Sequence, residues 1–202
     1  GEHGTTWIDE QVFVDRPGDW IADSVSGKRV GVYGLDYVMS VRDFRALDGG
    51  AAELVPWDVE FDHARAVKSE LELASVRDSV RINTEGFWIF LGHFAPGRTE
   101  RGILAPCERY FVEQGCGRLT MDMVLRGPNG GALPEFKIAG DGRIAATDMV
   151  LPSLEIAGAG GHWVEVSRAI CAGTPNDETK AMMDAYDEYY EAAHGALKAG
   201  AT

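Results

Sequence analysis

The chain has 202 residues, 45% of them hydrophobic and 25% charged, a composition typical of a soluble globular protein with one large domain or one and a half smaller ones. Its net charge of −13 argues against a nucleic-acid or anionic-membrane partner, because both require clustered Lys and Arg. An apolar run of about 18 residues and a signal-peptide pattern are both missing from the sequence, so we expect a cytoplasmic protein.

The first elements predicted along the chain are a strand, a helix and a second strand. Residues 28–33 form a short apolar run, residues 37–47 have a helical pattern, and residues 53–56 are strand-like after the Gly49-Gly50 break. Strand, helix and strand at this spacing indicate the end of an α/β unit.

Two helices are predicted next. Ser69 and Glu72 form a capping box, in which each side chain satisfies a free amide at the helix start. Pro96-Gly97 ends this helix, and Thr99 opens another that runs to Gly115. The expected apolar stripe of the first helix consists of Leu73, Val76, Val80, Phe87, Leu91 and Phe94.

The remaining elements are a strand, a hairpin and a final helix. The strand is predicted over residues 119–125 and the hairpin over residues 148–170. Thr174-Pro175 has the pattern of a helix start with proline at the first helical position. The expected buried face of this helix consists of Met182, Tyr186, Tyr189, Ala193 and Leu197.

The predicted hairpin brings two carboxylates together. If its glycine-rich turn is centred on Gly160, Glu155 pairs with Glu165, and polar residues alternate with apolar ones on both arms. Ser153 and Ser167 share the polar face with them. A slip of one residue would bury a charge and expose a valine, which disfavours other registers.

Opposed carboxylates repel each other at this spacing, so something must offset the repulsion. The sequence leaves four possibilities open: a bound cation, a shared proton, an Arg or Lys from elsewhere, or exposure to water. The last is the ordinary condition of glutamates on an amphipathic hairpin.

Several motifs along the chain resemble those of the pita-bread family of creatinases and Xaa-Pro aminopeptidases or dipeptidases. Residues 65–69 resemble the Arg-x-x-Lys-Ser junction between its two domains, and residues 96–100 resemble the Pro-Gly-x-Thr-Glu turn between its first two helices. Residues 127–134 resemble the loop that leads to a substrate-contacting histidine. The blocks at 148–151 and 161–168 resemble those that flank the two metal-binding aspartates.

The resemblance implies an α+β fold. Residues 1–62 would be the C-terminal part of an N-terminal α/β creatinase-like domain. Residues 63–202 would be the first half of a pita-bread catalytic domain, with two helices, antiparallel strands and a helix. Further catalytic His and Glu residues of the family would follow residue 202, so we expect a fragment that is inactive alone. The resemblance also implies a homodimer.

The chain departs from the family pattern at the site itself. Glu165 falls at the second metal aspartate, whereas Glu155 lies one residue from the first, whose expected position is bracketed by Ser153 and Leu154. Glu135 stands where the family has its substrate histidine. A mononuclear, altered or metal-free site is therefore open, and creatinases on this fold hydrolyse a C–N bond without metal.

The resemblance implies a hydrolase that cleaves a peptide or amide C–N bond in a small substrate. Glu155 and Glu165 would be its catalytic residues and the local ligands of Mn²⁺, Co²⁺ or Zn²⁺, which would activate a bound water. Without metal, the two carboxylates could share a proton and act as acid and base. Glu135 and His162 are candidate substrate-binding residues. The alternative is a non-catalytic pita-bread homologue that acts as a binding or scaffolding protein.

Overall fold

A computed structural model describes residues 13–117, 119, 122–127 and 137–201. The chain forms two compact units, an N-terminal unit of residues 1–68 and a C-terminal unit of residues 69–202. The boundary predicted at residue 62 falls inside a helix, and the membership of residues 1–62 in a creatinase-like domain stays a prediction. Each unit is described by itself.

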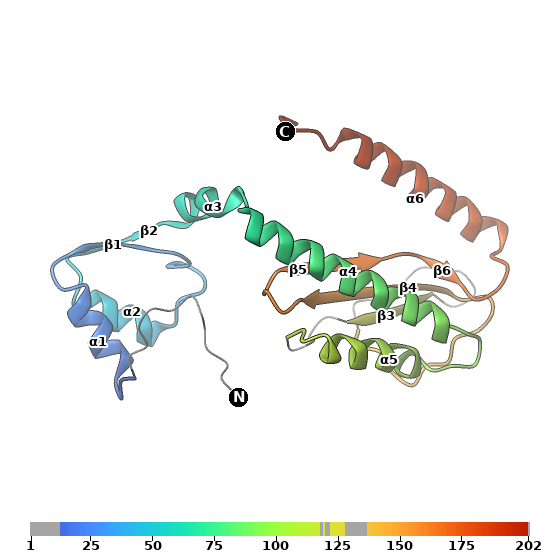
Figure 1. Ribbon diagram of the computed structural model, residues 1–202, viewed down its shortest axis with the longest axis horizontal. Helices are drawn as coiled ribbons and strands as arrows, with labels where there is room; N and C mark the ends of the chain where they lie inside the picture. Colours follow the sequence, from blue (N-terminus) through green and yellow to red (C-terminus); the bar gives the residue numbers. More distant parts are fainter. Residues whose placement is uncertain (1–12, 118, 120–121, 128–136, 202) are drawn as a thin grey trace. The chain divides into compact units, whose positions relative to one another are not determined.

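The N-terminal unit contains the predicted strand, helix and strand (Figure 1). Strands β1 and β2 are parallel with Val30 opposite Leu54, and α2 connects them. The connecting helix begins later than residue 37 because Ser40 caps it by accepting the Asp43 amide. The bounds of the elements are α1 Pro17–Ser24, β1 Arg29–Val32, α2 Val41–Asp48, β2 Glu53–Pro56 and α3 Asp58–Ala66.

The C-terminal unit opens with a helix pair, α4 (Glu70–His93) and α5 (Glu100–Glu113). The predicted capping box at Ser69 and the cap at Thr99 are both confirmed. The two helices approach closely at Gly86, where an added Cβ would stand 2.1 Å from a ring carbon of Phe111. Glycine at this position is therefore required by helix packing.

The predicted apolar stripe of α4 is only partly correct. Val80 is 47% exposed, and Phe87 and Phe94 are half-buried against the core. The fully buried face instead consists of Ser79, Ile82, Asn83, Gly86 and Phe90. This face is rich in small and polar side chains because it packs directly on the backbone of a hairpin, as described below.

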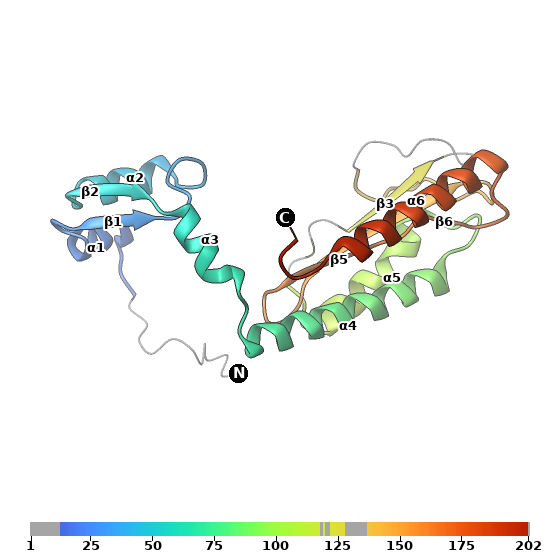
Figure 2. The same cartoon turned by 90° about the horizontal axis from the view of Figure 1, so that it is seen from above.

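An antiparallel sheet forms the second layer of the C-terminal unit, and α4 and α5 cover one of its faces (Figures 1 and 2). The strand order is β3, β4, β5, with β6 also paired to β4. Strand β3 starts and ends later than the strand predicted over residues 119–125. The bounds are β3 Met123–Gly127, β4 Met149–Ala157, β5 Trp163–Ser167 and β6 Ile170–Cys171. The core between the layers includes Ile82, Phe90, Ile103, Phe111, Val150, Leu154 and Ile156.

A buried ionic cluster joins α5 to the sheet, and we call Glu100, Arg126, Lys137 and Asp148 the Glu100 cluster. Both oxygens of the fully buried Glu100 are paired, to Arg126 Nε at 3.3 Å, to Lys137 Nζ at 3.1 and 3.3 Å, and to the Gly140 amide at 3.0 Å. Arg126 also pairs with Asp148 at 3.1 Å. Burial alone would raise the pKa of Glu100, but these donors outweigh it and hold the pKa below its ordinary value.

The last helix, α6, spans Asp177–Ala196. Asn176 caps it by accepting the Thr179 amide at 2.8 Å, so the prediction of a start at Thr174-Pro175 is wrong by two residues. Thr179 is its one buried residue. The predicted buried face is therefore wrong, since its members are exposed: Met182, Tyr186, Tyr189, Ala193 and Leu197. Within the described residues, helices long and apolar enough to cross a membrane are not found.

Candidate functional site

The β4–β5 hairpin has the register that the sequence predicts. Glu155 lies directly opposite Glu165, and Ser153 lies opposite Ser167. Leu154 is fully buried under the α4 layer, so the two carboxylates are on the other face of the sheet. The prediction that both glutamates share one face of the hairpin is confirmed.

The backbone amide of Glu155 points away from β5, the other strand of the hairpin. Its amide donates to Asp122 Oδ1 at 2.8 Å, outside the hairpin, so it does not donate across to Glu165. This makes 155 and 165 a non-hydrogen-bonded pair, the type in which opposite Cα atoms are about 4.5 Å apart and side chains come closest. Burial raises the pKa of the Asp122 carboxyl to about 7, against the lowering effect of the Glu155 amide.

A serine hydroxyl contacts one of the two carboxylates. Ser153, which is 6% exposed, donates from Oγ to Glu165 Oε1 at 2.7 Å. Glu155 is half-buried, whereas Glu165 is exposed. The predicted polar face therefore contains a hydrogen bond between the two strands, in which Ser153 of β4 orients the Glu165 carboxylate of β5.

The other face of the hairpin rests on α4 through close polar contacts. Asn83, which is fully buried, donates from Nδ2 to the carbonyl oxygens of Leu154 at 2.8 Å and Val164 at 3.3 Å. Two glycines of the turn lie against serines one and two helical turns earlier. A Cβ added at Gly158 would stand 2.3 Å from Ser79 Oγ, and one at Gly160 would stand 1.9 Å from Ser75 Oγ. We call Ser75, Ser79 and Asn83 the hairpin seat.

Of the two predicted substrate-binding residues, the structure describes only His162. His162 Nδ1 and Ser75 Oγ are hydrogen-bonded at 2.9 Å, on the side of the hairpin that faces α4. That contact anchors the turn. Glu135 lies outside the described residues. The substrate roles of both residues stay predictions.

The fit of a divalent cation to this site can be tested from the donors present. Two carboxylates that project from directly opposed strand positions suit a hard or borderline cation such as Mn²⁺. Within the described residues, no group of three or more His, Cys, Asp or Glu side chains comes together as a metal cluster. The described residues thus fit a cation as a partial ligand set of two carboxylates, with the Ser153 hydroxyl as a support for one of them.

A small apolar hollow lies beside the carboxylate face. Its volume is about 150 Å³, and Ser167 belongs to both the hollow and the polar face of the hairpin. The other side chains that line it come from β4, from the link between β5 and β6 and from the first half of α6: Met149, Leu151, Ala169, Met182, Met183 and Tyr186. The hollow places apolar surface on the same face of the sheet as the two carboxylates.

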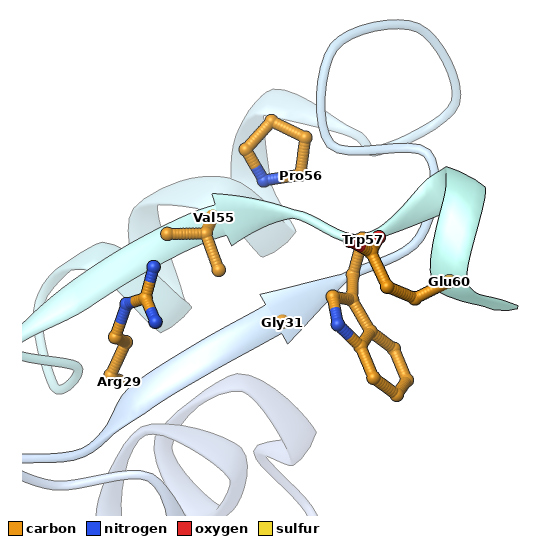
Figure 3. Close-up of a pocket in the computed structure, with 6 residues that line it drawn as sticks. All are labelled: Arg29, Gly31, Val55, Pro56, Trp57 and Glu60. Carbon is orange, nitrogen blue, oxygen red and sulfur yellow. The ribbon is translucent and has the colours of Figure 1, made fainter.

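A second hollow, of about 440 Å³, belongs to the N-terminal unit (Figure 3). It lies along β1 and β2, and its lining includes Arg29, Val55 and Trp57. The Trp57 ring packs on Gly31, where an added Cβ would stand 2.9 Å from the ring. Arg29 is engaged by Glu53 at 2.7 Å. This hollow brings together no pair of catalytic groups, so the hairpin is the stronger candidate.

The fold and the hairpin together define the class of the protein. Two helices behind an antiparallel sheet, with a carboxylate pair on the opposite face, form an α+β arrangement of the pita-bread type, as expected from the sequence. The chain belongs to metallopeptidase family M24, whose model matches residues 74–202.

Curated relatives agree with this family assignment. The chain is 27% identical over 129 residues to the uncharacterized peptidase YqhT of Bacillus subtilis, a match that covers 64% of the chain and 36% of that protein. It is 22% identical over 164 residues to a Xaa-Pro dipeptidase of Pyrococcus furiosus, with 81% and 43% covered. The chain therefore spans less than half the length of these relatives.

Solved structures share the fold. The X-Pro aminopeptidase from Thermotoga maritima superposes with a TM-score of 0.74 at 22% identity and covers 96% of this chain and 54% of its own. The prolidase from Pyrococcus horikoshii superposes with a TM-score of 0.75 at 22% identity, with 89% and 50% covered. These likenesses extend over both predicted regions of the sequence and confirm the expected fold class.

Proposed function

We propose that the chain supplies the carboxylate pair of a hydrolase that cleaves a peptide or amide C–N bond in a small substrate. The observation that supports it best is the opposition of Glu155 and Glu165 on the open face of the sheet, in a chain of a metallopeptidase family. The chain spans less than half the length of its curated relatives. Family membership therefore does not establish its activity or its substrate, and both are proposed.

Glu155 and Glu165 would hold a divalent cation, with Mn²⁺, Co²⁺ or Zn²⁺ as candidates. When bound, such a cation lowers the pKa of a water ligand and polarises the scissile carbonyl. The chain's own contribution is geometric. The non-hydrogen-bonded register brings the carboxylates close, the Asp122 carboxylate fixes the Glu155 backbone, and the Ser153 hydroxyl orients Glu165. A cation also offsets the repulsion between the two negative charges.

The substrate class follows from the surroundings of the pair. The apolar hollow beside Ser167 suits an apolar side chain or ring of a small peptide. The Xaa-Pro dipeptidases and aminopeptidases among the relatives act, by their names, on small peptides that contain proline. We therefore propose Xaa-Pro dipeptides and short peptides as first substrates, with small amides as the second choice.

Hydrolysis of Xaa-Pro dipeptides tests this proposal. The protein as the cell makes it is purified and assayed with Mn²⁺, Co²⁺ or Zn²⁺ beside Glu165→Gln, with Glu188→Gln on the exposed face of α6 as a matched control. Cation-dependent hydrolysis that is lost in Glu165→Gln and kept in Glu188→Gln supports the proposal. Hydrolysis that Glu165→Gln leaves unchanged contradicts it.

The small number of acidic side chains at the site favours a second function, which is binding without catalysis. Ser153 and Leu154, which bracket the expected first-ligand position, are poor metal ligands, and among the described residues no third acidic group joins Glu155 and Glu165. A non-catalytic homologue that binds a peptide or protein partner would need no more than this. Peptide binding measured by calorimetry, together with no hydrolysis under any cation, would favour that function.

A further inference from the structure

We infer that Asn83 is a positioning residue, which fixes the separation of Glu155 and Glu165 by bridging the backbones of β4 and β5 from the helix side. This inference rests on the proposed function, because it assigns Asn83 a role in the geometry of the proposed site. The observation that carries it is a side chain on α4 that binds the carbonyl immediately before each glutamate.

The placement of the two hydrogen bonds is specific. Nδ2 of Asn83 donates to the carbonyl oxygen of Leu154, the residue before Glu155, and to that of Val164, the residue before Glu165. One amide nitrogen therefore spans the two strands across the carboxylate pair, on the opposite face of the sheet. A change in strand separation would stretch at least one of these bonds.

The hydrogen bonds of Asn83 favour a role in bridging the two strands over a role in stabilising the fold. The side chain is fully buried, and its Oδ1 has no hydrogen-bond partner among the described residues. A buried amide oxygen without a partner costs free energy that an apolar residue of similar size would not. The two bonds that Nδ2 makes are what an apolar residue could not supply.

The contacts N-terminal to Asn83 show that α4 follows the hairpin over two further turns. One turn earlier, Ser79 lies against Gly158, and two turns earlier Ser75 contacts His162 and Gly160. Small and polar side chains at this four-residue spacing let the strands lie directly on the helix. The hairpin is thus held at its turn by the serines and at its carboxylate pair by Asn83.

Hydrogen exchange combined with Mn²⁺ affinity tests the inference. The variant is Asn83→Leu, which keeps the branching at Cγ and removes both bonds, and Ile82→Val is the control, because Ile82 is an equally buried neighbour in the helix core. If Asn83→Leu does not fold, Asn83→Ala takes its place. All variants are compared with the unaltered protein at the same fraction folded.

We expect Asn83→Leu to speed exchange of the β5 amides, residues 163–167, at least tenfold relative to those of α5. We also expect it to weaken Mn²⁺ binding about tenfold or more, as loss of a supporting contact behind a ligand does. Ile82→Val should change exchange evenly and leave Mn²⁺ affinity unaltered. Exchange in β5 that rises no more than in α5, or affinity that Asn83→Leu leaves unchanged, would overturn the inference.

The two proposals fail in different ways. If the unaltered protein does not bind Mn²⁺, the metal role proposed for the glutamates is wrong, and the exchange of the β5 amides alone decides whether Asn83 bridges the strands. If the unaltered protein binds Mn²⁺ and Asn83→Leu binds it equally well, the proposed function stands and the positioning role falls.

Discussion

The Glu100 cluster and the surroundings of the carboxylate hairpin both bury polar groups, but they satisfy them differently. Each oxygen of Glu100 has at least two donors, from Arg126, Lys137 or the Gly140 amide. Around the hairpin, Asn83 Oδ1 and Asp122 Oδ2 are buried without a hydrogen-bond partner among the described residues. Buried groups of that kind are few in native proteins.

We interpret the Glu100 cluster as a region whose pairing is needed for stability and the surroundings of the hairpin as a region that positions the backbone. Removing any partner of a fully paired buried charge lowers stability strongly, because the remaining charge is left uncompensated. Asn83 and Asp122 instead each use one atom to hold the backbone near Glu155 and leave the other atom unpaired. Local rules are broken in this way mainly at functional sites.

The largest effect is expected from neutralising both carboxylates. Glu155→Gln combined with Glu165→Gln should lower Mn²⁺ affinity by more than about a hundredfold, beyond the loss seen for supporting residues. The same change should raise the free energy of unfolding by about 0.5 kcal/mol, because opposed like charges repel. Calorimetry and urea denaturation measure the two quantities. A loss of stability would show that the pair is a structural element.

A change in the Glu100 cluster should have the opposite profile. Glu100→Gln leaves Arg126 and Lys137 without their buried partner, so it should cost on the order of 3 kcal/mol of unfolding free energy. Mn²⁺ affinity per folded molecule should not change. Denaturation and calorimetry on the same preparation test this, and a drop in affinity would mean that the two regions are coupled.

The pH dependence of stability sharpens the same comparison. The folded state holds the pKa of Glu100 below its ordinary value of 4.5, so its contribution is present above pH 4.5 and is lost as the pH falls through the folded value. Glu100→Gln should therefore lose stability less steeply in acid than the unaltered protein does. Urea midpoints between pH 3 and pH 7 measure the slopes, and parallel slopes would contradict this assignment.

A methyl group added at Gly158, which contacts the hairpin seat, should have an effect of intermediate size on stability. Gly158→Ala places a carbon 2.3 Å from Ser79 Oγ, so it should cost about 1 to 3 kcal/mol by overpacking. Adding Ser79→Ala should recover much of that loss, because it removes the clashing oxygen and leaves only the Ser79 Cβ, at 3.2 Å, without placing a glycine inside α4. Thermal or urea denaturation of the single and double variants shows whether α4 and the turn are in direct contact.

The smallest effect is expected at Ser153. Ser153→Ala removes the hydroxyl that donates to Glu165, which is worth about 1 kcal/mol or roughly a fivefold change in cation affinity. Ser167→Ala on the opposite strand is the control, because Ser167 shares the same face. Equal effects of the two variants would argue against a specific Ser153 to Glu165 contact.

The hairpin could be predicted from sequence because its alternation is strict and its turn is rich in glycine. Those two signals fix the register that pairs Glu155 with Glu165. The capping box at Ser69 was equally plain, since the pattern is local. Both features depend on residues close together in the chain.

The hairpin seat could not be predicted in the same way. Ser79 and Asn83 are polar, and polar residues on a helix ordinarily face solvent, so the periodicity predicts an apolar stripe on a neighbouring face of the helix. Their burial depends on a backbone about 70 or more residues further along. A four-residue spacing of small and polar residues on α4, matched to the glycines of the turn, was the one signal that could have indicated it.

The central claim is that Glu155 and Glu165 bind one cation together, and paramagnetic broadening by Mn²⁺ tests it most directly. In a two-dimensional amide spectrum, sub-stoichiometric Mn²⁺ should broaden the resonances of Glu155 and Glu165 first and to the same extent. Glu165→Gln should abolish the broadening at both positions. Broadening that begins instead among the acidic residues of α6, with the hairpin resonances unaffected, would contradict the account.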